Sequence, residues 1–418
     1  MSDRIAPILD DVRTYRELFA VVEFRAIFIA QCCTVAAASV GGLAMGVLSY
    51  SETGSALLSG LAMFGGPLVR LFASWFLVAA SDTIRPRTAL VAVAALTAAV
   101  DAVQAVPSLP LALRFVLVIL PWLALSATGG TLLALVADIV PSGGYVFGRA
   151  TLNIAVGVMQ IVGYGVAGVL LLHFGPAELF AGAAVVSLLA VVTVRFGVAD
   201  HDARADAGRI VRRSHQLNTA LLRSPVVRPV LLALWVPNGL VVGCESLFVP
   251  YGQREAGYLL CAAAAGMLVG DVVVGRFVSP HLRERLVGPL RYLLAAPYLI
   301  FLTDPPLALA AAASLVASVG YAASLPLQER LVTWTDESVR GQVLGLNSTG
   351  MLAGQGVAAV AAGGLAQLLG ADRSAAALVM GLFAAVSLVV STLLIPGLRR
   401  SRMPVVVAPG APIEERVV

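Results

Sequence analysis

The chain has 418 residues, of which 59% are hydrophobic and 12% charged, and its mean hydropathy is +0.91. Soluble domains carry roughly 25% charged residues, so this composition excludes an ordinary soluble protein and indicates a polytopic membrane protein. The basic residues are all arginine, and membrane topology explains their placement better than affinity for nucleic acid does.

Apolar runs long enough to span a membrane, about 20 residues each, follow one another along the chain. Six are predicted before residue 200, at 24–49, 55–81, 87–106, 111–138, 147–173 and 177–197. Six more are predicted at 226–250, 256–278, 286–303, 307–330, 342–369 and 374–396. We therefore expect an all-α polytopic membrane protein with twelve transmembrane helices. The first run is long enough to remain as a span, so no cleaved secretory signal is expected.

The polar segment 195–228 separates the two sets of spans and is too short to fold as a domain. It predicts an N-terminal six-helix bundle (1–198), a cytoplasmic linker (199–225), a C-terminal six-helix bundle (226–397) and a cytoplasmic tail (398–418). The halves also repeat at a spacing of 195, which aligns Gln160 with Gln355 and Gly168 with Gly363. Equal span numbers and matching orientation favour a duplicated unit with pseudo-symmetric bundles.

Arginine placement predicts the orientation of the chain. With both termini in the cytoplasm, the outer loops contain only Arg254 and Arg373, and the inner segments contain most of the remaining arginines. Cytoplasmic loops carry this excess of basic residues, so we expect a multi-pass protein of the inner (plasma) membrane with both termini inside. The four cysteines fall in apolar runs and are interpreted as small hydrophobic residues, not as disulfides or metal ligands.

Three segments carry a resemblance to a known family. They are "VAASDTIRPR" between spans 2 and 3, "GRFVSPHLRER" at the equivalent place in the second half, and "ESVRGQVLGLNSTG" at the start of span 11. With the twelve-span plan, the chain resembles a major facilitator superfamily transporter, specifically a drug-exporter-like bacterial member. The resemblance implies alternating access between two bundles, a monomer, and a substrate exchanged across the lipid bilayer.

The first segment departs from the family pattern, because Val78 replaces a glycine and Thr83 a basic residue. The family's antiporter signature has a Gly-Pro step in span 5, whereas Val166 stands at the proline position here.

The resemblance suggests an inner latch between the halves. Asp82 could accept main-chain N–H bonds at the start of span 11 and pair with nearby arginines. The gating candidates are Asp82, Arg85, Arg87, Arg276 and Arg340. The alternative is that Arg85 and Arg87 only anchor the cytoplasmic end, which leaves Asp82 unexplained.

Charges within predicted spans are costly and are functional candidates. Arg70 lies about 11 residues from the inner end of span 2, roughly 16 Å along the helix. It faces either a substrate cavity or a structural partner. Asp101 and Arg114 lie at matching depths on adjacent spans, and a structural ion pair is the favoured interpretation.

Two further acids are candidates for proton coupling. Glu245, near the outer end of span 7, could hold a proton in apolar surroundings and release it when the cavity opens to water. Its alternative is contact with the outer interface. Asp271 in span 8 is expected to pair with Arg276 or Arg283 as an inner gate, with proton carriage as the second interpretation.

Polar uncharged residues in the spans are candidates for the substrate cavity: Gln31, Asn153, Gln160, Asn238, Asn347 and Gln355. Taken singly, each is more often an interhelical hydrogen-bonding group. No phosphate-binding loop, nucleophile or metal-ligand spacing is present, so neither an enzyme nor a cofactor is expected. The sequence favours proton-coupled efflux of a small amphipathic or drug-like molecule. Import of a small anionic metabolite bound by Arg70 and a non-transporting scaffold or sensor remain alternatives.

Overall fold

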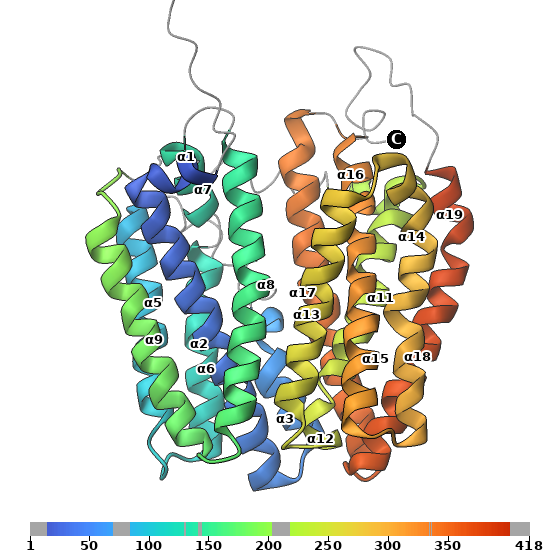
Figure 1. The fold of residues 1–418 in the computed structure, drawn as a ribbon, viewed down its shortest axis with the longest axis horizontal. Helices are drawn as coiled ribbons and strands as arrows, with labels where there is room; N and C mark the ends of the chain where they lie inside the picture. The colour runs from blue at the N-terminus through green and yellow to red at the C-terminus, as the bar shows by residue number, and fades with distance from the viewer. Residues whose placement is uncertain are drawn as a thin grey trace, which may run out of the picture.

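The computed structural model describes residues 15–69, 84–128, 131–140, 144–202, 218–333, 335 and 337–401. The described part of the chain is helical and forms two side-by-side groups of helices (Figure 1). The N-terminal half contains α1 (Tyr15–Ala20), α2 (Val22–Thr53), α3 (Ala56–Phe64), α5 (Pro86–Gln104), α6 (Leu111–Thr128), α7 (Thr131–Ile139), α8 (Tyr145–Leu170) and α9 (Pro176–Gly197).

The C-terminal half is built the same way, with two 3₁₀ segments. It contains α11 (Val227–Glu245), α12 (Phe248–Tyr251), α13 (Ala256–Phe277), α14 (Pro280–Ala295), η2 (Ala296–Thr303), α15 (Leu307–Val319), η3 (Gly320–Ala323), α16 (Ser324–Thr333), α17 (Glu337–Leu368), α18 (Arg373–Leu393) and α19 (Ile395–Arg400).

Ten helices among the described residues are long and apolar enough to cross a membrane. An eleventh span forms if Leu111–Ser126 and Thr131–Ile139, which meet at a bend of 41°, are counted together. Part of the predicted second span, 55–81, lies outside the described residues, and α3 is its described beginning.

Helix boundaries follow from local chemistry. Proline occupies the start of α5, α9 and α14, where its missing N–H costs no helical hydrogen bond. Gly54 adopts a φ of 64° and ends α2, a left-handed conformation that glycine tolerates best. Asp372 then begins α18 by accepting a hydrogen bond from the Ala375 main-chain N–H at 2.7 Å.

We define the termini face as the end of the molecule that carries α1 and the end of α19, and the distal face as the end that carries α12 and the α2–α3 turn (Figure 1). The halves meet where α8 packs on α13 and α3 packs on α17. Glycines permit both contacts. A Cβ added to Gly257 would lie 2.4 Å from the Cα of Gly168, and one added to Gly363 would lie 2.8 Å from the Cα of Leu57. Such close approach between helices is typical of membrane proteins.

Residues that precede and follow the predicted C-terminal bundle (226–397) also pack into its core. Leu221 and Leu398 are buried in one cluster with Leu231 and Leu327. The start of the predicted tail therefore contributes to the core of this half.

Candidate functional site

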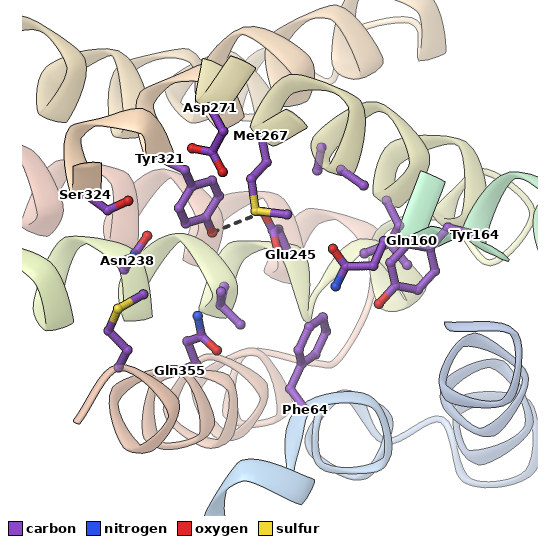
Figure 2. Close-up of a pocket in the computed structure, with 15 residues that line it drawn as sticks. Phe64, Gln160, Tyr164, Asn238, Glu245, Met267, Asp271, Tyr321, Ser324 and Gln355 are labelled. Atoms are coloured by element: carbon purple, nitrogen blue, oxygen red, sulfur yellow. Dashed lines mark hydrogen bonds between the residues drawn. The ribbon is translucent and has the colours of Figure 1, made fainter. Parts of the chain in front are cut away.

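A cavity of about 300 Å³ lies between the two halves and is the candidate functional site. Its lining includes polar, aromatic and thioether side chains from both halves: Phe64, Gln160, Tyr164, Asn238, Glu245, Met267, Asp271, Tyr321, Ser324, Met351 and Gln355. Figure 2 shows these side chains converging from helices far apart in the sequence. The cavity has the concave shape and the few placed polar groups of a small-molecule site.

Five residues predicted from the sequence lie together in this cavity. Gln160 comes from α8, Asn238 and Glu245 from α11, Asp271 from α13 and Gln355 from α17. Gln160 and Gln355 are the glutamines aligned by the internal repeat, and both line the same cavity from opposite halves. The pseudo-symmetry of the fold therefore extends to the polar groups of the site.

Glu245 is the acid of the cavity that accepts a hydrogen bond from another lining residue. The Tyr321 hydroxyl lies 3.3 Å from Glu245 Oε1 and donates a hydrogen bond to it (Figure 2). Tyr164, Tyr298 and Cys244 also lie within electrostatic range of this carboxyl group. Hydroxyl groups around a carboxyl group can donate to its ionised form, so its protonation can depend on the contents of the cavity.

Two amide oxygens that line the cavity lack a hydrogen-bond partner within the described part of the chain. They are Asn238 Oδ1 and Gln160 Oε1, and both atoms are buried. Asn238 as a whole is only 5% exposed. Because buried polar atoms are nearly always paired in proteins, these two acceptors are available to a hydrogen-bond donor in the cavity.

Asp271 does not form the inner-gate pair expected from the sequence. It is exposed, lines the cavity and forms no ion pair with either expected arginine. Arg283 instead donates hydrogen bonds to the carbonyls of Val278 and Gly275, at 2.8 and 2.9 Å, and Arg276 is exposed. Asp271 therefore lines the cavity without either expected arginine as its partner.

Three other predicted cavity residues lie elsewhere. Gln31 lines a separate cavity of about 330 Å³ within the N-terminal half, together with Thr34, Thr97 and Ser187. Asn153 is exposed and does not line the central cavity. Asn347 is 4% exposed, and the Trp235 indole donates to its carbonyl oxygen at 3.1 Å, a structural contact.

The expected ion pair between Asp101 and Arg114 is not formed. Arg114 is 2% exposed and donates instead to the main-chain carbonyls of Gln104, Leu109 and Val106. Ser187 donates to Asp101 Oδ2 at 3.1 Å. Main-chain carbonyls at a helix end have no helical N–H partner and can accept hydrogen bonds from a guanidinium group as well as a carboxylate can. The matching depths of Asp101 and Arg114 therefore did not make them partners.

Two of the arginines assigned to the inner latch, Arg85 and Arg87, form ion pairs with the segment that follows α9. Arg85 Nη1 lies 2.8 Å from Asp200 Oδ2, and Arg87 Nη2 lies 3.4 Å from the same oxygen. Arg85 also approaches Asp202 at 3.8 Å. These pairs join the start of α5 to the first residues of the predicted linker, directly after α9.

The remaining latch and cavity candidates lie outside the described residues or are described only in their main chain. Arg70 and Asp82 lie outside the described residues, and only the main chain of Arg340 is described, within α17. Their roles stay predictions.

Sequence reasoning missed Arg330, which organises the termini face of the C-terminal half. This side chain is 5% exposed and binds both carboxylate oxygens of Glu284 through hydrogen bonds. It also donates to the Leu398 carbonyl at 3.1 Å and to Ser401 Oγ at 3.2 Å. Because Arg330 lies at the predicted end of span 10, the sequence offered no sign that it was buried.

Arg291 was also missed. It is 2% exposed, and two of its guanidinium nitrogens have no partner in the part of the chain that the structure describes. The sequence predicted a span from 286, which placed Arg291 near an end. In the structure α14 begins at Pro280, so Arg291 lies near the middle of the span Pro280–Thr303.

The distal face carries a second charged cluster, beside the contact between the halves. Arg373 Nε lies 2.7 Å from Asp304 Oδ1, and its guanidinium also lies 4.0 Å from the centre of the Tyr251 ring. The hydrogen bond and charge of Arg373 lower the pKa of Asp304. Next to Arg373, the Ala371 carbonyl accepts a hydrogen bond from the Tyr50 hydroxyl of the other half.

Comparison with known proteins identifies the fold. No protein-family model matches the chain, and no curated protein matches it. Solved structures do match. A POT family transporter in complex with 5-aminolevulinic acid is 11% identical, with a TM-score of 0.70, covering 91% of this chain and 96% of that one.

A D-xylose-proton symporter is 12% identical, with a TM-score of 0.67, covering 90% of this chain and 97% of its own. A peptide transporter POT in complex with sulfate is 12% identical, with a TM-score of 0.69, covering 91% and 94%. At these identities the likeness concerns the fold, which is that of the major facilitator superfamily: an all-α membrane architecture of two six-helix bundles.

Proposed function

We propose that the chain is a secondary transporter that moves a small amphipathic molecule by alternating access and couples this movement to protons. The observation that carries the proposal is the Glu245 carboxyl group, which lines the cavity between the halves and accepts a hydrogen bond from Tyr321. A titratable group at the boundary between two moving bundles can change its charge with the contents of the cavity, and this change acts on both bundles.

The chemistry of coupling follows from the cost of charge in a membrane. An ionised Glu245 is favoured when the cavity contains water or a counter-charge, whereas a sealed apolar cavity favours the protonated form. Closure around an empty cavity would therefore be easiest with Glu245 protonated. Exchange of a proton for substrate at this acid links the two transport half-cycles.

The structure supports one end of such a cycle. The halves touch at the distal face through Gly168 and Gly257 and through the Tyr50–Ala371 hydrogen bond. If the termini are cytoplasmic, as arginine placement predicts, this is a conformation closed toward the outside.

Export of a drug-like molecule is the direction we favour, because apolar side chains such as Phe64, Leu260 and Met267 line the cavity beside its polar groups. Import is the second candidate function, since one protein of the same fold is a D-xylose-proton symporter. An anion importer would use Arg70, and a scaffold or sensor would bind ligand without flux.

The test is flux in proteoliposomes with a panel of small amphipathic cations, anions and neutral compounds, with and without an imposed pH gradient and a protonophore. We expect gradient-driven flux that the protonophore abolishes and that Glu245→Gln reduces to the level of empty liposomes. Glu52→Gln, an exposed acid on the distal side of α2, is the matched control and should transport normally. Flux that persists with the protonophore, or in Glu245→Gln, would reject proton coupling at this site. Absence of flux for the whole panel would favour the scaffold.

A further inference from the structure

We propose that the central cavity selects molecules with an apolar body and a hydrogen-bond-donating ammonium group, bound by Asp271 and the amide oxygens of Asn238 and Gln160. This inference rests on the proposed function of the same cavity and names the chemical class of its substrate.

The charge of the described lining is negative. Two lining residues are acidic, Glu245 and Asp271, and no arginine or histidine belongs to the described lining. The arginines near Asp271 are bound to main-chain carbonyls or exposed, as described above for Arg283 and Arg276. A lining whose described residues include carboxylates and no cationic side chain attracts cations and repels anions.

Independently of charge, the lining also offers free hydrogen-bond acceptors. The unpaired buried atoms in the lining, Asn238 Oδ1 and Gln160 Oε1, are both acceptors. An acceptor is satisfied only by a donor, and an ammonium group offers three N–H donors and no acceptor. A carboxylate ligand would leave both oxygens unpaired and add a like charge, so it is the poorest match to this lining.

The wall of the cavity also has an apolar part. Phe64, Tyr164 and Met267 line the same cavity as the polar groups and lie beside them (Figure 2). Aromatic faces attract cations as well as apolar groups, and a thioether adapts its shape to apolar ligands. The volume of about 300 Å³ fits a small amphipathic amine, at the lower end of ordinary ligand cavities.

The two acids then have different tasks. Glu245 is engaged by Tyr321 and keeps the proton-coupling role. Asp271 lines the cavity and is exposed, so it is the carboxylate that can meet an ammonium group directly.

Four probes that share a phenylpropyl body separate charge from hydrogen-bond donation. They are 3-phenylpropylammonium, its trimethylammonium analogue, 3-phenylpropanol and 4-phenylbutanoate. Binding is measured to the full chain, purified in detergent at pH 7, by equilibrium dialysis. We expect the ammonium to bind at least about tenfold more tightly than the alcohol. The trimethylammonium should fall between them, because it keeps the charge but has no donor, and the carboxylate should bind most weakly.

Variants assign the effect to residues. Asp271→Asn should lower affinity for both cations to near that of the alcohol, and Asp271→Glu should retain the preference. Asn238→Leu should weaken the ammonium more than the trimethylammonium, which cannot use the amide oxygen. The matched control is Asn153→Leu, an exposed amide outside the cavity, which should change none of the affinities. Equal binding of ammonium and alcohol by the wild-type chain would overturn the inference even if a variant failed to fold.

Tighter binding of the carboxylate, lost in Arg70→Ala, would overturn it in favour of an anion site. Failure of the proposed function is a separate outcome. If the ammonium binds with the expected selectivity but no pH gradient drives flux, the transport proposal fails and the cation site stands. If gradient-driven flux is found only for the carboxylate, the cation site fails and transport stands.

Discussion

The Tyr50 hydroxyl donates a hydrogen bond to the Ala371 carbonyl and thereby joins the N-terminal half to the C-terminal half at the distal face. Ala371 adopts a left-handed φ of 58°, and the residues after it are held in place. Asp372 starts α18 through the Ala375 N–H, and Arg373 is bound to Asp304. The acceptor for Tyr50 is thus part of an ordered turn.

Removing this hydrogen bond should favour opening of the distal face. We predict that Tyr50→Phe, which keeps the ring, shifts the equilibrium by about 1 kcal/mol, or roughly fivefold. The measurement is the distance distribution between spin labels at Glu52 and Ser374, with the native cysteines replaced. Tyr292→Phe removes a hydrogen bond to Thr392 within one half and should leave the distribution unchanged. Identical distributions in Tyr50→Phe and wild type would contradict a role for Tyr50 in holding the halves together.

Adding a methyl group at the α8–α13 contact should push the halves apart. In Gly257→Ala the new Cβ would lie 2.4 Å from Gly168 Cα, so main chain must move. Overpacking of this kind costs about 1–3 kcal/mol, and we expect a lower thermal unfolding midpoint in detergent. Gly42→Ala, where nothing lies within 4 Å of the added Cβ, is the control. A midpoint as high as that of the control would show that the two helices separate readily.

Arg114 should stabilise the α5–α6 turn independently of Asp101. Because Arg114→Leu leaves several buried carbonyls unpaired, it should lower the free energy of unfolding by about 3 kcal/mol. Asp101→Asn keeps a side chain that can accept from Ser187 and should cost less than about 1 kcal/mol. Chemical denaturation of both variants distinguishes the two arrangements. Equal losses would indicate that the two side chains form an ion pair after all.

The distal charged cluster should weaken in acid. Arg373 lowers the pKa of Asp304 below its unfolded value, so the folded state binds the proton less tightly. The resulting stabilisation is fully present above the unfolded value, about pH 4, and is lost as pH falls through the lower folded value. Unfolding midpoints between pH 3 and 7 should show wild type converging on Asp304→Asn at the acid end. A constant difference across this range would exclude the contribution.

Much of the architecture could be predicted because membrane spans require long apolar runs. The same requirement makes polar residues within those runs stand out. Five of them do line one cavity: Gln160, Asn238, Glu245, Asp271 and Gln355. Which face each polar residue would occupy was harder to predict. Helices in this chain are apolar nearly all round, so periodicity separates lipid-facing from cavity-facing positions weakly.

Partners were the least predictable part of the site. Tyr321 stands in an apolar run without a charge to mark it, yet it binds Glu245. Arg114 was assigned to a carboxylate at the same depth, but main-chain carbonyls freed by the turn were closer. Sequence spacing gives depth along a helix, whereas partner choice depends on rotation about its axis and on the main chain nearby.

The contact between Gly168 and Gly257 affects the rate at which the two halves can change conformation. Where side chains interlock, two helices must disengage them before they can tilt, and each disengagement adds to the activation barrier. Here the main chain of Gly168 faces the main chain of Gly257, and a Cβ added at either position would lie 3.0 Å or less from the opposite Cα. No side chains have to disengage at this point before the two helices tilt. The rate of exchange between conformations should therefore depend more on the Tyr50–Ala371 hydrogen bond and the Arg373–Asp304 pair nearby than on this contact.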